Sequence, residues 1–234
     1  MRDRIYLLSI EDFLEKSDGM VLIKQALDKV DKSRREKAER IKRQSAKAAC
    51  VGAGLLLQVA IRDVLEQSSN RVPVVETKKV SPDIQNDSAK YSVRELLEKI
   101  DSPISLEFAY GPNGKPYFKE YPIYFNLSHS GEFVICVVSE KEVGVDIQEH
   151  RGGNMERIAK RYFTVEEKKT LDECEPAGRP QMFFDLWAAK EAYGKYTGGG
   201  ITESLEQEVP ANKVAMQLIH NIPGYSLVVC KGME

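Results

Sequence analysis

The stretch Val143-Gly144-Val145-Asp146-Ile147-Gln148 carries the clearest strand pattern in the chain. Successive side chains of a strand point to opposite faces, so the three β-branched residues share one face and Asp146 and Gln148 share the other. At about 3.3 Å per residue, the two polar residues lie roughly 7 Å apart at Cα. Their side-chain oxygens are close enough to bind one ion, although many strands with this alternation simply have one face in water.

A second informative stretch is Phe183-Phe184-Asp185-Leu186-Trp187-Ala188-Ala189-Lys190-Glu191-Ala192-Tyr193-Gly194-Lys195, which we interpret as a helix. Four of its residues share one side by i, i+3, i+4 spacing: Phe184, Trp187, Glu191 and Lys195. An exposed Glu/Lys pair at this spacing is common and contributes about 0.3–0.5 kcal/mol. Here the pair shares its side with the only Trp of the chain and with a Phe. That side is expected to be partly buried, which indicates a specific role for the two charges.

The stretch Phe125-Asn126-Leu127-Ser128-His129-Ser130-Gly131 places a hydroxyl next to an imidazole. A Ser/His nucleophilic pair is disfavoured, because neighbouring side chains on a strand point apart and no GxSxG turn is present. A structural histidine is the ordinary interpretation of His129. A hydroxyl and an imidazole followed by Gly also suit phosphate oxygens, so both interpretations stay open at this point.

The strongest local charge bias lies between residues 32 and 47, where eight basic residues accompany two acids. A solvated helix face with Glu/Lys pairs is the ordinary explanation. A site for a multiply charged phosphate ligand is the alternative. Nucleic-acid binding is disfavoured, because the segment lacks the basic and aromatic interleaving of single-strand binders and the whole chain has a net charge of −2.

Together these stretches contain the groups that a phosphoryl-transfer site needs. Carboxylate and amide oxygens suit a hard cation, and such a cation neutralises a diphosphate. Lys195, His129 and the basic segment suit the remaining phosphate oxygens. Catalysis of this kind consists mainly of positioning and charge neutralisation.

The composition is that of an ordinary globular protein, with 42% of the 234 residues hydrophobic and 30% charged. Lys and Arg number 34 against 36 Asp and Glu, so no global charge points to nucleic acid or an anionic membrane. Apolar runs such as 51–57 are shorter than the ~20 residues of a membrane span, and the run 5–10 is too short for a signal peptide. The four cysteines lack metal-type spacing, which favours free thiols and a soluble cytoplasmic protein.

Helical and strand patterns alternate around these stretches. A strand at 5–10 and helices at 20–30 and 45–65 precede a polar region, 68–103, which we interpret as a variable insertion with one short helix at 93–100. Later strands are expected at 104–110, 124–127, 132–139, 143–148 and 225–230, and later helices at 155–162, 165–172 and 181–196. This order indicates an α+β (mixed α/β) fold with antiparallel sheet.

Several of these stretches resemble the motifs of the Sfp-type 4′-phosphopantetheinyl transferases. The similarity is close over 110–205 and looser over 31–60. In chain order the motifs are Gly114-Lys115-Pro116, the stretches 125–131 and 143–148, Arg161-Tyr162-Phe163-Thr164 through Glu167, the stretch 186–195, and the loop Gly198-Gly199-Gly200-Ile201. Each motif alone is weak, whereas their order and separations together are specific.

The resemblance implies an enzyme, a 4′-phosphopantetheinyl transferase with holo-[acyl-carrier-protein] synthase activity. Such an enzyme moves the 4′-phosphopantetheine arm of coenzyme A to a serine hydroxyl of an apo acyl- or peptidyl-carrier protein and releases adenosine 3′,5′-bisphosphate. Mg²⁺ is the implied cofactor, with Asp146, Gln148 and Glu191 as its ligands. The residues implied for coenzyme A binding are Arg34, Lys37, Lys115, Pro116, Ser128, His129 and Lys195. The implied catalytic residues are Glu191, Lys195 and His129.

By the same resemblance, Lys195 contacts the diphosphate, and Lys115 and Pro116 lie against the adenine. Arg34, Lys37, Ser128 and His129 then surround the 3′-phosphate or the diphosphate. Many members of the family have Glu where this chain has Gln148, whose amide oxygen brings no charge but can still ligate Mg²⁺ or hold it through a water. Glu191 is the candidate to accept the serine proton. A water as proton acceptor, with Glu191 only a ligand, is the open alternative.

The implied fold has two pseudo-symmetric halves, each a small antiparallel sheet with a long helix, and coenzyme A binds in the cleft between them. In this chain the halves are expected at 1–140 and 141–234. A monomer is expected, with no nucleic-acid or membrane partner. A protein that binds coenzyme A or a nucleotide without turnover is the alternative from a different class, and Gln148 motivates it.

Overall fold

The computed structural model describes residues 3–69, 87–119, 121, 123–199 and 208–233. By contacts within the chain, the protein divides into two compact units. The first unit consists of Met1–Glu107 and Leu127–Ser139, and the second of Phe108–Asn126 and Glu140–Glu234. The two pseudo-symmetric halves expected at 1–140 and 141–234 stay a prediction, because the units are defined by contacts and not by symmetry. Residues 108–126, within the first expected half, belong to the second unit by contacts.

The first unit is built on a four-stranded sheet of order β2-β1-β6-β5. Strand β1 (Arg4–Ser9) pairs antiparallel with β6 (Phe133–Ser139) and parallel with β2 (Asp87–Ser92). The outer strand β5 (Tyr124–Ser130) begins in the second unit and continues into the first. The β1–β2 pairing departs from the antiparallel sheet that we expected. Strand β2 lies in the predicted insertion, of which residues 70–86 are outside the described residues.

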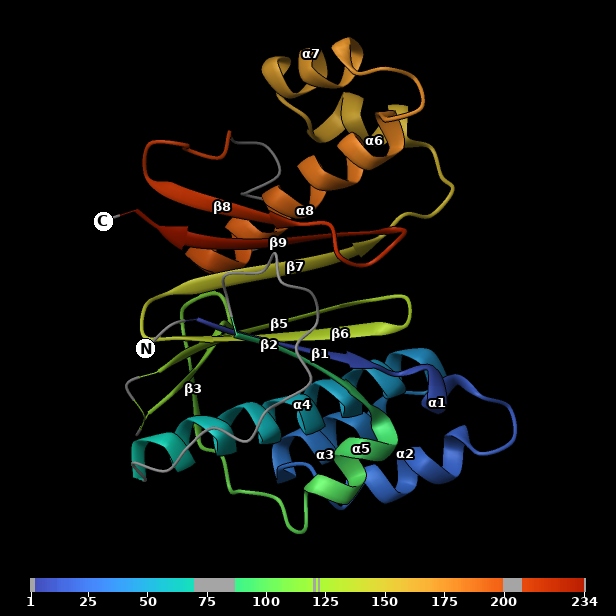
Figure 1. Ribbon diagram of the computed structural model, residues 1–234, viewed down its shortest axis with the longest axis vertical. Coiled ribbons are helices and arrows are strands. Elements are labelled where there is room, and N and C mark those ends of the chain that lie inside the picture. Colours follow the sequence, from blue (N-terminus) through green and yellow to red (C-terminus); the bar gives the residue numbers. More distant parts are fainter. Residues whose placement is uncertain (1–2, 70–86, 120, 122, 200–207, 234) are drawn as a thin grey trace. The chain divides into compact units, whose positions relative to one another are not determined.

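Helix α4 (Gln44–Ser69) is the core helix of the first unit and packs on β6 and β1 (Figure 1). Its apolar residues, such as Val51, Leu55 and Ile61, have no exposed surface, as in a helix that is buried on several sides. By length and composition Gln44–Glu66 could cross a membrane, but 83% of its most apolar window is buried inside the protein, as in a core helix. The other helices of this unit are α1 (Glu11–Leu14), α2 (Gly19–Leu27), α3 (Lys32–Arg40) and α5 (Val93–Lys99).

The second unit is built on a three-stranded antiparallel sheet of order β7-β9-β8. Its strands are β7 (Val143–Glu149), β9 (Tyr225–Gly232) and β8 (Val214–Ile219). Strands β3 (Phe108–Tyr110) and β4 (Pro116–Phe118) form a separate antiparallel hairpin. These small antiparallel sheets with helices confirm the predicted α+β class. The four cysteines are free thiols, also as predicted.

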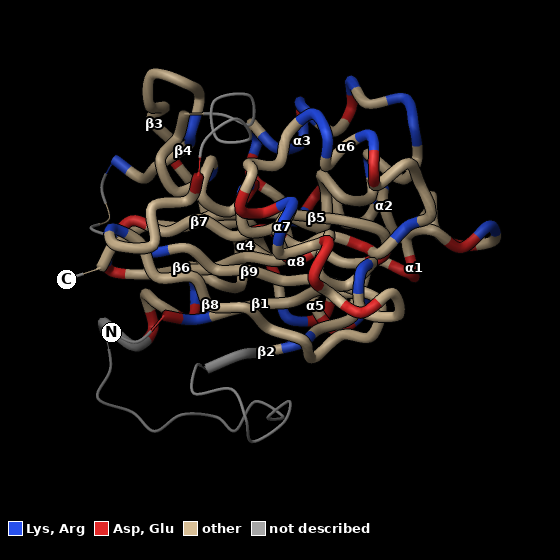
Figure 2. The backbone as a smooth tube through the Cα atoms, turned by 90° about the horizontal axis from the view of Figure 1, so that it is seen from above, with Lys and Arg blue, Asp and Glu red and all other residues tan. Residues whose placement is uncertain are grey.

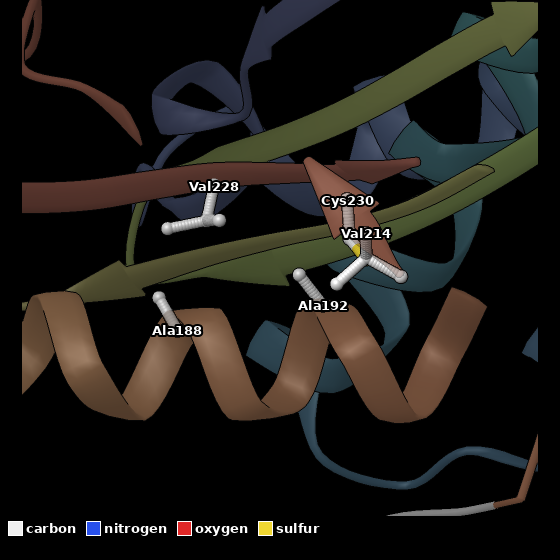
Figure 3. Close-up of a cluster of buried hydrophobic side chains, with 5 residues drawn as sticks. All are labelled: Ala188, Ala192, Val214, Val228 and Cys230. Atoms are coloured by element: carbon white, nitrogen blue, oxygen red, sulfur yellow. The ribbon is translucent and has the colours of Figure 1, made fainter. Parts of the chain in front are cut away.

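Helix α8 (Arg179–Thr197) packs on the β7-β9-β8 sheet (Figure 1). It has a proline in its first turn and ends at Gly198, whose φ of 70° lies in the left-handed region that favours glycine. Figure 3 shows the small residues of this contact, which are Ala188 and Ala192 of α8 against Val214, Val228 and Cys230 of the sheet. Small side chains on the helix allow the close approach on which the site depends.

Helices α6 (Met155–Tyr162) and α7 (Val165–Glu173) pack against α8. Ala159 and Phe163 share a buried cluster with Phe183 and Phe184 of α8. Lys190 of α8 has no exposed surface, and its ammonium donates hydrogen bonds to both carboxylate oxygens of Glu167, at 3.0 and 2.9 Å. This buried ion pair fixes α7 to α8.

Candidate functional site

Strand β7 and helix α8 approach each other most closely at Gly144. A Cβ at this position would lie 2.1 Å from the carbonyl oxygen of Ala192, which is too short for any non-bonded contact. Only glycine lets the two backbones meet here. Because residues two apart on a strand share a face, Asp146 also faces the helix.

Asp146 is the buried carboxylate of the site, with 2% of its surface exposed. The ammonium of Lys195, on α8, donates a hydrogen bond to its Oδ1 at 2.6 Å. The strand and helix that the sequence singled out separately are therefore joined by a direct ion pair. Lys195 keeps about a quarter of its side chain exposed, so its ammonium lies between the buried carboxylate and solvent.

Glu191, one helical turn before Lys195, adds a second carboxylate. Burial, together with the nearby Asp146 carboxylate, raises the pKa of Glu191 to about 7. Lys195 and a hydrogen bond from Trp187 oppose this rise in pKa only in part. Two carboxyl groups thus lie close together in a partly buried place, where one counter-charge is too few for both to be ionised.

Gln148 shares the face of Asp146, and its amide Nε2 lies 3.4 Å from the carbonyl oxygen of Glu149. The described part of the chain contains no group of three or more His, Cys, Asp and Glu side chains arranged to hold a metal. The donor set that does exist is two carboxylates, with an amide oxygen on the same strand face. Hard oxygen ligands of this kind fit Mg²⁺, whose remaining positions are commonly filled by water and substrate phosphate.

The side of α8 that the sequence marked as special is partly buried, as expected. Phe184 is buried and Trp187 half-buried within the aromatic cluster that joins α8 to α6. Trp187 lies one helical turn before Glu191 and lowers the pKa of that carboxyl. The aromatic cluster and the acidic residue are therefore neighbours on one side of α8.

Lys115 lies in the turn before β4, and three oxygens hold its ammonium. Nζ donates to the Glu142 carboxylate, to the carbonyl oxygen of Val143 at 3.1 Å and to that of Tyr196 at 3.0 Å. These contacts join the turn to the start of β7 and the end of α8. The positive charge of Lys115 is therefore neutralised by oxygen atoms of its own unit. Its methylene chain lies close to Gly198.

A pocket of about 530 Å³ lies beside Lys115 and Pro116. Its aromatic walls include Phe118 and Phe125, whose ring centroids are 4.7 Å apart. The other lining residues include Gly111, Tyr117, Tyr121, Tyr124, Glu140, Glu142, Tyr196, Thr197 and Gly198. A largely apolar pocket with a few polar groups suits a planar ring such as a purine. Of the Gly198-Gly199-Gly200-Ile201 motif beside it, Gly200 and Ile201 lie outside the described residues.

The other predicted coenzyme A residues belong to the first unit. Arg34 and Lys37 lie on α3, a short helix in which basic residues outnumber acidic ones (Figure 2). Burial raises the pKa of the Cys136 thiol on β6, and the guanidinium of Arg34 partly opposes that rise. Ser128 and His129 are neighbours on β5, the first buried and the second exposed. Their roles stay predictions.

Sequence reasoning missed two supports of the site. The buried Asn126 accepts a hydrogen bond from the backbone N–H of Val145 at 3.0 Å through Oδ1, and so fixes β7 one residue before Asp146. The buried pair of Lys190 and Glu167 was also missed. A signal existed for the second, because Thr164 and Glu167 have the spacing of a capping box, which the structure shows.

Comparison with known protein families shows to which family this chain belongs. A family model described as the 4′-phosphopantetheinyl transferase superfamily matches residues 142–224. The 4′-phosphopantetheinyl transferase AcpT of Salmonella typhi is 33% identical over 142 residues, which are 58% of this chain and 72% of that protein. This chain belongs to the 4′-phosphopantetheinyl transferase superfamily. The family to which the motifs of the sequence pointed is thereby confirmed.

Other members of the superfamily are similar over shorter stretches. AcpT of Escherichia coli K12 is 39% identical over 109 residues, or 45% of this chain and 55% of that protein. The 4′-phosphopantetheinyl transferase Sfp of Bacillus subtilis 168 is 33% identical over 111 residues, or 47% of each chain. The chain spans about half the length of these two relatives. The superfamily match at 142–224 includes Asp146, Gln148, Glu191 and Lys195.

Proposed function

We propose that this protein transfers the 4′-phosphopantetheine arm of coenzyme A to a serine of an apo acyl- or peptidyl-carrier protein. The serine oxygen bonds to the phosphorus on the pantetheine side of the diphosphate. The bond from that phosphorus to the bridging oxygen breaks, adenosine 3′,5′-bisphosphate leaves, and the serine proton passes to a base. The observation that carries this proposal is the meeting of Asp146, Glu191 and Lys195 in the segment that matches the superfamily.

Asp146, Glu191 and the amide oxygen of Gln148 are the proposed ligands of Mg²⁺. The raised pKa of Glu191 supports this assignment, because two neighbouring carboxyl groups lack the positive charge that would let both ionise. When bound, Mg²⁺ would neutralise the charge that develops on the diphosphate. Gln148 contributes an oxygen without charge, so the protein's own ligands carry two negative charges rather than three.

Lys195 is proposed to exchange its partner during the reaction. Without substrate its ammonium is paired with Asp146, and one quarter of its side chain is exposed. With substrate it turns to a phosphate oxygen of the diphosphate, which it reaches as a flexible point charge. Glu191 is the proposed acceptor of the serine proton, because its carboxylate lies beside Asp146 and Lys195, where the diphosphate would bind.

The remaining contacts to coenzyme A are proposed from the pocket and from the resemblance. Lys115 and Pro116 line the pocket that would take the adenine. Four residues of the first unit are proposed for the phosphates: Arg34, Lys37, Ser128 and His129. A cytoplasmic monomer is proposed, with neither nucleic acid nor a membrane as partner.

Intact-mass spectrometry of apo carrier proteins tests the proposal. Incubation with this protein, coenzyme A and Mg²⁺ is expected to add the mass of phosphopantetheine, and EDTA is expected to prevent the addition. Asp146→Ala is expected to abolish transfer, whereas Asp172→Ala, at an exposed position on α7, serves as the matched control. Near-normal transfer by Asp146→Ala would contradict the metal assignment.

A protein that binds coenzyme A without turnover is the second candidate, and the amide at Gln148 favours it. Calorimetry with coenzyme A separates the two candidates. Binding without modification of any carrier protein would select the second one. In that case Gln148→Glu, which adds the missing charge, is the first variant to test for recovered transfer.

A further inference from the structure

A hydrogen-bonded network joins α8 to the sheet away from the Asp146–Lys195 pair. Ser226 Oγ, on β9, donates to Asp185 Oδ1 on α8, and His150 Nε2, just after β7, lies 2.9 Å from Ser226 Oγ. Gln181 Nε2 donates to Asp185 Oδ1 at 2.8 Å and to Ser226 Oγ at 3.2 Å. We call Asp185, Ser226, His150 and Gln181 the Asp185 network.

The Asp185 network is closely packed around the buried Ser226, and its other three members are partly buried. Ser226 has no exposed surface, and the side chain of Asp185 is 12% exposed. The His150 ring stacks on Phe184, with centroids 4.8 Å apart and an angle of 9° between the planes. His220 Nε2 lies 3.1 Å from each carboxylate oxygen of Asp185, and half of the His220 side chain is exposed to solvent. Such a network has one defined geometry and holds the elements that it joins.

The network adjoins the proposed metal ligands without containing any of them. Ser226 is paired with Gln148 in the β7–β9 register, so their side chains lie on the same face of the sheet. Along α8, Asp185 precedes Glu191 by about 9 Å at about 1.5 Å per residue. The two elements that carry Asp146, Gln148, Glu191 and Lys195 are therefore joined at one end by the Asp146–Lys195 pair together with Lys115, and at the other by the network.

Apart from these polar joints the contact is apolar, and on the helix side its buried residues are the small Ala188 and Ala192 (Figure 3). Apolar contacts between small side chains resist sliding along the helix axis less than directional hydrogen bonds do. In the proposed function, Lys195 leaves Asp146 for the diphosphate. The Asp185 network is then the polar joint at its end of α8, while Lys115 still joins Val143 of β7 to Tyr196 at the other end.

We propose that Asp185, acting through Ser226 and His150, is a positioning residue that sets the register of α8 on β7 and so holds Glu191 opposite Asp146 for divalent-cation binding. This inference rests on the proposed function, because it assumes that these carboxylates bind a cation. It assigns no contact with substrate to the network.

Mn²⁺ binding to the full chain tests the inference without turnover. Trp187 is the only Trp and lies one helical turn before Glu191 on α8, so quenching of its fluorescence by Mn²⁺ reports occupancy at this carboxylate. Asp185→Ala is expected to weaken Mn²⁺ binding about tenfold, the lower end of the usual effect of residues that orient metal ligands. Ser226→Ala is expected to act in the same direction.

Two variants serve as controls. Asp185→Asn keeps an oxygen that accepts from Ser226 and Gln181, and it is expected to bind Mn²⁺ like the wild type. His220→Ala removes only the exposed partner and is expected to do the same. Thermal unfolding of each variant establishes that the protein is folded at the temperature of the titration.

Unchanged Mn²⁺ affinity in folded Asp185→Ala and Ser226→Ala would overturn the inference. Equal losses in Asp185→Asn and Asp185→Ala would also overturn it, because the charge rather than the hydrogen-bond geometry would then matter. If the wild type binds no Mn²⁺ and modifies no carrier protein, the proposed function itself fails. If the wild type both binds Mn²⁺ and modifies a carrier protein, the results for the variants test only the role of the Asp185 network.

Discussion

The ammonium of Lys190 has no exposed surface and lies 2.9 Å from Oε2 of Glu167. Removal of one partner from a buried ion pair removes the opposite charge that stabilises the other partner away from water, at a cost of about 3–5 kcal/mol. Glu167→Gln is the sharper variant, because the amide oxygen can still accept the capping hydrogen bond from the N–H of Thr164. We expect it to lower the free energy of unfolding by about that amount, measured by urea denaturation.

The pair of Lys169 and Glu173 on α7 is the matched control. Its atoms are 4.0 Å apart, and the side chains are 65% and 69% exposed. Lys169→Gln is expected to change the free energy of unfolding by less than about 0.5 kcal/mol. A similar loss in both variants would show that burial is not what makes the first pair important.

Gly144→Ala is expected to separate β7 from α8. The added Cβ would lie 2.1 Å from the Ala192 carbonyl oxygen, so the helix must shift, at a cost of about 1–3 kcal/mol. Gly152→Ala is the control, because no atom lies within 4 Å of the added carbon. We expect a lower unfolding midpoint and weaker Mn²⁺ binding only for Gly144→Ala. Normal stability in that variant would contradict the close packing.

The stability of the metal-free protein is expected to fall as the pH rises from about 4.5 to about 7. Burial and Asp146 raise the pKa of Glu191 from 4.5 to about 7, so the unfolded state releases this proton first and gains relative stability over that interval. Glu191→Gln should remove this slope and raise the unfolding temperature above pH 7 in EDTA. Thermal unfolding across the interval measures it, and an unchanged slope would argue against the raised pKa.

Lys115→Met is expected to raise the KM for coenzyme A about tenfold, which corresponds to about 1.4 kcal/mol. The ammonium holds three oxygens at one end of the pocket, and their loss loosens the pocket wall. Steady-state kinetics of carrier modification measures the effect, with the exposed Lys119→Met as control. Equal KM values in the two variants would show that the pocket does not take part in coenzyme A binding.

The elements that carry the site could be predicted from the sequence, because their patterns are local. The expected strand at 143–148 is β7, Val143–Glu149, and the expected helix at 181–196 is α8, Arg179–Thr197. Alternation along the strand placed Asp146 and Gln148 on one face. The helical spacing placed Glu191 and Lys195 beside Trp187.

Three strands, β2, β4 and β8, could not be predicted, since pairing rather than propensity defines them. Strand β2 has the polar sequence Asp-Ser-Ala-Lys-Tyr-Ser and exists through its parallel pairing with β1. Strand β8 is short and joins the sheet through β9. The expected strand at 104–110 shrinks to Phe108–Tyr110, whose partner is β4.

Within the site, contacts between residues far apart in the chain could not be predicted from the sequence either. Nothing local to Lys195 shows that its partner is Asp146, or that three elements meet at the ammonium of Lys115. The Asp185 network joins residues that are up to 76 positions apart in the chain. Such contacts follow from the arrangement of the sheet and α8, which spacing alone does not determine.

Each compact unit is assembled from two separate segments, so the chain passes between the units after residues 107, 126 and 139. No single cut of the polypeptide therefore releases either unit whole. During synthesis, the sheet of the first unit must wait for β6, which leaves the ribosome after the β3–β4 hairpin of the second unit. Maturation of the two units is therefore interleaved in time, and a truncation within 108–139 deprives both of strands at once.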